Sequence, residues 1–164
     1  MSFATADLCD SHEDQIRNGQ LRIVAPMFRS FGGRPAFSGL VATLKLFEDN
    51  SFVRKALDQP GNGRVLLVDG GGSLRRALVG DQLAALGVKN GWSGIVVYGA
   101  IRDAAAIAAM DIGVLALATH PQKTDKKNVG AADVAVSFGG ITCHPGEWLY
   151  ADSDGILVAV AALT

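Results

Sequence analysis

Between residues 81 and 119 the chain alternates twice between a segment with helical spacing and a run of apolar residues. DQLAALGVKN (81–90) places its apolar residues on one face of a helix, and GIVVYGA (94–100) is a continuous apolar run typical of a buried strand. RDAAAIAAMD (102–111) and GVLALAT (113–119) repeat this order. A helix that links two strands predicts a crossover between parallel neighbours, so this stretch favours an α/β fold.

The flanking sequence adds strands of a second kind. FSGLVATLKLF (37–47) and RVLLVDGGG (64–72) predict strands on either side of a helix that Pro60, Gly61 and Gly63 end. Thr5 to Ser11 predicts a short helix, and LRRALV (74–79) a short strand on which Arg75 and Arg76 point to opposite sides. Four further short strands are expected near the end of the chain, in DVAVSF, GGITC, EWLYAD and GILVAV. The sheet is therefore expected to be mixed.

Composition limits the class of protein. A chain of 164 residues with 49% hydrophobic and 19% charged residues predicts one domain, residues 1–164, with a sizeable core and some apolar surface between subunits. Lys and Arg total 15 against 16 acids, which disfavours direct nucleic-acid binding and attraction to an anionic membrane. No targeting or membrane-spanning segment is recognised, so we expect a cytoplasmic protein in which Cys9 and Cys143 are reduced.

One glycine-rich segment, VDGGGSLRRA (68–77), follows a predicted strand. It matches neither GxGxxG nor GxxxxGK[ST], and the residues after it favour a strand over a phosphate-binding helix start. A structural or site-lining turn is therefore preferred to a nucleotide loop.

Three charged residues follow predicted strands at the points where helices begin. Asp81 is separated by twenty residues from the pair Arg102 and Asp103, which is the length of one helix and one strand. Both carboxylates could be ordinary helix N-caps. In an open α/β sheet, however, the strand-to-helix turns line one edge, where ligands bind. The two turns are thus expected to face one pocket.

The residue types in these turns suit the chemistry of a small 2-oxo acid. A carboxylate is a ligand for Mg²⁺ or Mn²⁺, and a guanidinium can hold a substrate carboxylate or a developing enolate. The first helical turn from Gly80 to Leu83 offers unpaired backbone N–H groups to an anion. These features predict a metal-assisted site for a carboxylic acid.

Longer segments carry a specific resemblance to a known family. FGGRPAFSG (31–39), VLLVDGGGSLRRALVGDQLA (65–84), YGAIRD (98–103), DIGVLAL (111–117) and FGGITCHPGEWLYADSDGILV (138–158) resemble the RraA-like family. That family contains the regulator of ribonuclease E activity A and the metal-dependent 4-hydroxy-4-methyl-2-oxoglutarate aldolases. The resemblance implies a swivelling β/β/α three-layer sandwich and a homotrimer with sites near subunit interfaces.

In the aldolase members the D-x20-R-D pattern marks the active site. The resemblance implies that Asp103 binds the divalent metal, that Arg102 holds the substrate and its enolate, and that Asp81 hydrogen-bonds metal-bound water. The backbone of Gly80, Asp81, Gln82 and Leu83 would bind the pyruvyl carboxylate. The implied activity is a class II aldolase with oxaloacetate decarboxylase side activity. The alternative is a non-catalytic regulator that binds ribonuclease E, whose members lack the intact Arg-Asp pair.

Other polar residues are assigned structural or surface roles. His12, His120 and His144 stand in no ligand spacing, although His120 or His144 could edge a pocket. Lys123, Lys126 and Lys127 predict a solvated loop, with a gate for an anionic substrate as the second interpretation. Trp92 and Trp148 are expected to pack.

Overall fold

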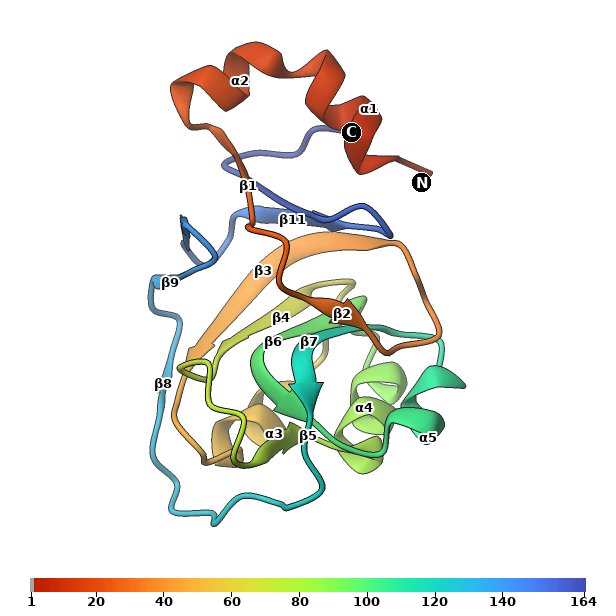
Figure 1. Cartoon of the computed structure of the whole chain (residues 1–164), viewed down its shortest axis with the longest axis vertical. Helices are drawn as coiled ribbons and strands as arrows, with labels where there is room; N and C mark the ends of the chain where they lie inside the picture. Colours follow the sequence, from red (N-terminus) through yellow and green to blue (C-terminus); the bar gives the residue numbers. More distant parts are fainter. Residues whose placement is uncertain (1) are drawn as a thin grey trace.

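The computed structural model describes residues 2–164, which form five helices and twelve strands (Figure 1). The helices are α1 (Thr5–Ser11), α2 (Glu13–Asn18), α3 (Ser51–Leu57), α4 (Asp81–Lys89) and α5 (Ala104–Ala108). The strands are β1 (Leu21–Ile23), β2 (Arg29–Ser30), β3 (Phe37–Lys45), β4 (Val65–Asp69), β5 (Ala77–Val79), β6 (Gly94–Ile101), β7 (Gly113–Thr119), β8 (Ala131–Ala132), β9 (Val136–Phe138), β10 (Ile141–Cys143), β11 (Trp148–Ala151) and β12 (Ile156–Ala159). In this part of the chain no helix is long and apolar enough to cross a membrane.

A parallel sheet forms the centre of the molecule. Strands β3, β4, β6 and β7 pair in parallel in that order, and β5 pairs in parallel with the end of β6. Helices α3, α4 and α5 cover one face of this sheet (Figure 1). Their apolar residues pack on the strands in the largest core cluster, which includes Val53, Leu57, Ile95, Ile107 and Ile112. The predicted crossovers are confirmed.

Strand β3 also belongs to an antiparallel sheet. Its first half pairs with β11, which continues through β12 to β1. A second core cluster fills the space between this sheet, the hairpin β9–β10 and the other face of the parallel strands. The predicted α/β fold with a mixed sheet, arranged in β/β/α layers, is therefore confirmed.

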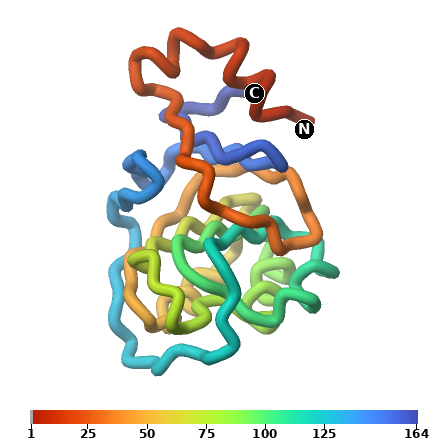
Figure 2. The backbone as a smooth tube through the Cα atoms, in the orientation of Figure 1, coloured from red at the N-terminus to blue at the C-terminus, as the bar shows by residue number. Residues whose placement is uncertain are grey.

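Helices α1 and α2 add a layer outside the antiparallel sheet (Figure 1). Leu8 packs against Leu21, Tyr150 and Leu157 in a third apolar cluster. The Asp152 carboxylate accepts hydrogen bonds of 2.7 Å from both the N–H and the hydroxyl of Thr5. The two ends of the chain consequently lie on the same side of the molecule (Figure 2).

One predicted element is shorter than expected. Strand β5 begins at Ala77, so Arg75 and Arg76 lie in the preceding turn and do not alternate across a strand. Arg75 instead pairs with Glu48, and Arg76 donates to the side chain of Gln122. The glycine-rich segment folds as a turn in which Gly71 and Gly72 have φ of +68° and +72°. The N–H of Gly71 donates to the Asp69 carboxylate, and the N–H groups of Gly70 and Gly72 donate to the Tyr98 carbonyl.

The two sheets approach closely around Phe37. Gly94 and Gly113 pair directly across β6 and β7, and the Phe37 ring lies over both. A Cβ atom on Gly94 would lie 2.3 Å from the ring, and one on Gly113 would lie 2.0 Å from it. These two glycines are required because the aromatic ring occupies the space of their missing side chains.

Replacement of Gly113 by Ala is expected to lower the free energy of unfolding by about 3 kcal/mol, because the methyl group overlaps the buried Phe37 ring. Gly155→Ala is the matched control, since nothing lies within 4 Å of the added methyl group. Urea unfolding of the three proteins measures the difference. Equal stability of the two variants would contradict this account of the sheet packing.

Candidate active site

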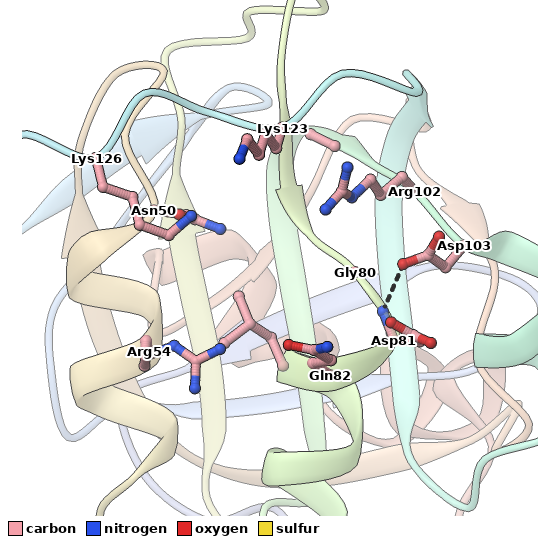
Figure 3. A pocket seen from close by; sticks show the side chains of 11 residues that line it. Asn50, Arg54, Gly80, Asp81, Gln82, Arg102, Asp103, Lys123 and Lys126 are labelled. Carbon is pink, nitrogen blue, oxygen red and sulfur yellow. Dashed lines mark hydrogen bonds between the residues drawn. The ribbon is translucent and has the colours of Figure 1, made fainter.

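A cavity of about 140 Å³ lies at the carboxyl edge of the parallel sheet. The turns that enter α3, α4 and α5 surround it together with the loop after β7 (Figure 3). Its walls are formed by Asn50, Arg54, Ala77, Gly80, Asp81, Gln82, Leu83, Arg102, Asp103, Lys123 and Lys126. All the site residues expected from the sequence are therefore brought to one cavity, whose size suits a small organic acid.

A hydrogen bond joins the two strand-to-helix turns. The backbone N–H of Asp81 donates to Oδ2 of Asp103 over 3.0 Å (Figure 3). Gly80 allows this approach, since a Cβ atom there would lie 2.7 Å from the same oxygen and 3.4 Å from Nε of Arg102. The absence of a side chain at Gly80 is thus what lets the Asp103 carboxylate reach the start of α4.

The interpretation of Asp81 as a helix N-cap is wrong, and that of Asp103 is confirmed for its position only. Gly80 occupies the N-cap position of α4, and Asp81 is the first residue of that helix. Asp103 does occupy the N-cap position of α5, but its side chain makes no hydrogen bond to that helix. It satisfies an N–H group of α4 instead, so each carboxylate stays available to the cavity.

Asp103 also has an unusual backbone. Its φ is +58° and its ψ +40°, a left-handed conformation that costs energy in a residue with a side chain. This conformation aims the carboxylate away from α5 and towards Gly80 (Figure 3). Such strain at the edge of a cavity is typical of residues kept for function.

Arg102 is fixed by its backbone more than by its side chain. Its N–H donates to the Val79 carbonyl over 2.9 Å, which extends the pairing of β5 and β6 by one residue. The guanidinium makes one hydrogen bond, from Nη1 to the Pro121 carbonyl at 3.4 Å. Among residues 2–164 no carboxylate forms a salt bridge with Arg102, so its charge is available to a ligand.

Asn50 and Arg54 line the cavity although the sequence did not single them out. They stand four residues apart at the start of α3, the helix that follows β3, and therefore share one face of it. The signal that could have revealed them is the same as for Asp81, namely a polar residue where a parallel strand passes into a helix. Figure 3 shows both side chains directed towards the cavity.

The basic loop 120–130 closes the opposite wall of the cavity. Lys123 and Lys126 are exposed, as expected, yet both also line the cavity, which supports the second interpretation of an anion gate. Together with Arg54 and Arg102 they give four basic side chains against the two acids Asp81 and Asp103. The lining is thus suited to a ligand with more than one negative charge.

Buried polar contacts fasten this loop to the start of α3. Asn50 donates to the Leu78 carbonyl over 3.0 Å and accepts from the Thr124 hydroxyl over 2.8 Å. Asp49 accepts from Lys127 N–H at 2.8 Å and Val129 N–H at 3.1 Å. Burial opposes ionisation of Asp49, but these bonds and two from Ser51 lower its pKa to about 2. The basic loop is therefore anchored by a carboxylate that stays charged.

The acids of the cavity suit a hard divalent cation. Asp103 accepts one hydrogen bond through Oδ2, and no group among residues 2–164 donates to Oδ1. The same part of the chain contains no cluster of three His, Cys, Asp or Glu side chains placed to hold a metal. Mg²⁺ keeps several waters and needs only one or two protein carboxylates, so a site built on Asp103 with Asp81 beside it fits that ion.

The remaining residues have the roles expected. Trp92 is buried, and its indole N–H donates to the Gln59 carbonyl over 3.1 Å. Cys9 and Cys143 are free thiols. His120 edges a second hollow beside Arg102 and Asp103, whereas His144 lies in the β10–β11 turn.

A parallel sheet with a cationic cavity at its carboxyl edge defines an α/β protein with a candidate site for a small anion. Residues 5–158 match the RraA-like family, described as Aldolase/RraA, and the chain belongs to this family. A relative from Aromatoleum aromaticum is 59% identical over 99% of both chains and is named "Putative 4-hydroxy-4-methyl-2-oxoglutarate aldolase".

Two solved structures share the fold. One, from Geobacillus kaustophilus, is described as an S-adenosylmethionine: 2-dimethylmenaquinone methyltransferase, with 47% identity, a TM-score of 0.92, and coverage of 98% of this chain and 97% of that one. The other, described as the RNA-processing inhibitor RraA from Thermus thermophilis, has 44% identity, a TM-score of 0.91, and coverage of 98% and 94%. The different descriptions of these similar chains show that the fold alone does not identify the activity.

The anchor at Asp49 predicts how the stability of the protein changes with pH. A carboxylate whose pKa falls from about 3.9 in the unfolded chain to about 2 on folding stabilises the fold above pH 4. This contribution disappears as the pH falls towards 2. Asp49→Asn is therefore expected to lower the free energy of unfolding by about 1–3 kcal/mol at pH 7, because the N–H groups of Lys127 and Val129 lose a charged acceptor.

Urea unfolding of the wild type and Asp49→Asn between pH 7 and pH 3 measures this contribution. The difference between the two proteins should shrink on acidification. Asp58→Asn is a control, because Asp58 is exposed at the end of α3 and accepts no side-chain hydrogen bond in the described chain. A difference that stays constant with pH would show that Asp49 does not act as a charged anchor.

Proposed function

We propose that the protein is a divalent-metal-dependent carbon–carbon lyase that cleaves 4-hydroxy-4-methyl-2-oxoglutarate to pyruvate. The observation that carries this proposal is the juxtaposition of Arg102, which forms no salt bridge within residues 2–164, with Asp103 and the first turn of α4 in one cavity. The names of close relatives agree with a lyase of this kind.

The pyruvyl end of the substrate would bind at the start of α4. The N–H of Asp81 is used by Asp103, but those of Gln82 and Leu83 belong to the first helical turn and have no partner within the helix. They lie at the positive end of the helix dipole, where a carboxylate is stabilised. Binding here places the adjacent 2-oxo group beside Arg102 and Asp103.

Cleavage of the C3–C4 bond needs a sink for the electron pair and a base for the C4 hydroxyl proton. Mg²⁺ or Mn²⁺ held by Asp103 would supply Lewis acidity at the 2-oxo group. The Arg102 guanidinium would stabilise the negative charge that develops on the enolate oxygen. Asp81 lines the same cavity and would accept the C4 hydroxyl proton, directly or through water, and return of this proton to C3 of the enolate would complete the second pyruvate. Oxaloacetate decarboxylation passes through the same enolate, so it is the expected side activity.

The opposite wall would bind the second carboxylate of the substrate. Arg54, Lys123 and Lys126 line the cavity across from the start of α4 (Figure 3). Their positive charges complement a dicarboxylate and are more than a monocarboxylate requires. This wall would select 4-carboxy-2-oxo acids from other aldols of pyruvate.

A homotrimer in the cytoplasm is the assembly proposed for this enzyme. Phe47 and Val129 are 57% and 64% exposed at the same edge of the sheet as the cavity, and Leu74 is 48% exposed. Exposed large apolar side chains at one edge are typical of a subunit interface. A trimer would place such an interface beside the cavity.

Regulation of ribonuclease E by protein contact is the second candidate, supported by the structural likeness to the RNA-processing inhibitor. The intact Arg102 and Asp103 pair favours the enzyme. A chain that shows no metal-dependent turnover but slows RNA cleavage by ribonuclease E would reverse this order.

Release of pyruvate from 4-hydroxy-4-methyl-2-oxoglutarate should require Mg²⁺ or Mn²⁺ and stop in EDTA. Arg102→Ala should lower kcat by about 100-fold or more, since it removes a charge that stabilises the enolate. Asp103→Ala should abolish the response to metal. Lys127→Ala is the control, because Lys127 is exposed in the basic loop 120–130 and does not line the cavity. Full activity of either site variant would exclude the proposal.

Arg54→Ala should separate binding of the second carboxylate from chemistry at the 2-oxo group. We expect KM for 4-hydroxy-4-methyl-2-oxoglutarate to rise about 10- to 150-fold, because a charge-assisted hydrogen bond is worth about 1.5–3 kcal/mol. Exchange of the pyruvate methyl protons in D2O should change little, since pyruvate has no second carboxylate. Lys55→Ala, the exposed neighbour, serves as control. Equal loss in both assays would place Arg54 at the wrong end of the substrate.

A further inference from the structure

The guanidinium of Arg102 depends on one backbone carbonyl for its orientation. Its single side-chain hydrogen bond among residues 2–164 runs from Nη1 to the Pro121 oxygen at 3.4 Å. The carboxylate of the adjacent Asp103 accepts from the N–H of Asp81. Within residues 2–164 this carboxylate forms no salt bridge with Arg102. Whatever fixes the Pro121 carbonyl therefore also fixes the direction in which Arg102 offers its donors.

His120 closes the turn that contains Pro121. The N–H of Gln122 donates to Nδ1 of His120 over 3.1 Å. This contact, from a side chain to the N–H two residues later, has the pattern of the turns that Asn and Asp side chains make. Nδ1 must be unprotonated to accept it, so in the neutral ring the proton lies on Nε2. The imidazole thus acts as the acceptor that holds residues 120–122 in a turn.

The same turn is attached to the two strands that carry the site. The N–H of His120 donates to the Ile101 carbonyl at 2.9 Å, directly before Arg102. The Gln122 carbonyl accepts from Ala77 N–H at 2.8 Å, at the start of β5. The turn therefore bridges the end of β6 to β5, and a change in its shape would move the Pro121 carbonyl relative to Arg102.

His120 also lies in the right place to influence the site. It lines a hollow of about 220 Å³ with Arg102, Asp103, Ala104, Thr119 and Pro121. This hollow shares Arg102 and Asp103 with the lining of the main cavity. The side chain is half-buried, so it is held in place without belonging to the core.

We propose that His120 is a positioning residue, which orients the Arg102 guanidinium by closing the 120–122 turn and fixing the Pro121 carbonyl. The catalytic consequence rests on the proposed function, in which Arg102 stabilises the enolate. The closure of the turn is independent of that function. A misplacement of a catalytic group by about 1 Å can lower a rate by about 100-fold, so a hydrogen bond outside the main cavity is sufficient to affect catalysis.

Two substitutions separate positioning from a direct role of the imidazole. Asn at position 120 can accept the Gln122 N–H in an ordinary Asx-turn, whereas Ala cannot. We expect His120→Ala to lower kcat about ten- to 100-fold and to leave KM within about threefold of the wild-type value. The reason is that the interaction of Arg102 with the enolate oxygen strengthens in the transition state. His120→Asn should keep about half of the wild-type kcat or more. His144→Ala, at an exposed histidine in the β10–β11 turn, should behave as wild type.

A double-mutant cycle tests whether His120 acts through Arg102. In an Arg102→Ala background, His120→Ala should cause no further loss of kcat, since the group it positions is already absent. A loss that multiplies with that of Arg102→Ala would overturn the proposal. So would equal defects in His120→Ala and His120→Asn, or wild-type kcat in His120→Ala.

Hydrogen exchange of the Gln122 amide tests the turn without any turnover. Exchange should be faster in His120→Ala and close to wild type in His120→Asn. If the wild type lacks lyase activity but the exchange rates follow this order, the proposed function is wrong, whereas the closure of the 120–122 turn by His120 is confirmed. If exchange at Gln122 is the same in all three proteins, His120 does not close the turn and the proposal fails.

Discussion

Main-chain pairing of strand β6 determines where Arg102, Asp103 and the start of α4 lie relative to one another. This strand pairs in parallel with β4 on one side, with β7 on the other, and with β5 at its end. Its beginning carries Gly94, against which Phe37 packs, and its end is followed at once by Arg102 and Asp103. The position of these two candidate site residues is therefore set by three ladders of backbone hydrogen bonds. Such ladders involve no site side chain, so the site residues are free to be chosen for chemistry.

The strongest local consequence of this arrangement is the contact between Asp103 and the start of α4. Asp103 adopts a left-handed backbone and uses one oxygen to satisfy the N–H of Asp81. In doing so it replaces the cap that Gly80 cannot provide. Among residues 2–164 no group donates to the other oxygen, and both carboxylates line one cavity. Asp103 thus both caps α4 and lines the cavity. The sequence predictions of a helix cap and of a site residue therefore apply to the same side chain.

Much of the fold could be predicted because its strands and helices have clear periodicity. The alternation of helical and apolar segments between residues 81 and 119 predicted a parallel centre, and the twenty-residue gap predicted that Asp81 lies beside Arg102. Asn50 and Arg54 were missed because their approach depends on the pairing of β3 with β4, which brings α3 to the same edge. The prediction of a strand over residues 74–76 was wrong. Arg75 and Arg76 lie in a turn there, where their side chains contact Glu48 and Gln122. No periodicity encodes such tertiary contacts.

The basic loop after β7 shows how polar contacts at a distance can govern a cationic cavity. One end of the loop is tied to β5 and β6 through the His120 turn, and the other end is tied to Asp49 at the start of α3. Lys123 and Lys126 lie between these two anchors. Four basic side chains around one cavity repel each other when no anion is bound, so the loop would tend to open if either anchor were absent. Two attachments built from backbone N–H groups resist that repulsion without placing a further carboxylate in the cavity. The cavity can therefore keep its positive charge for an anionic ligand.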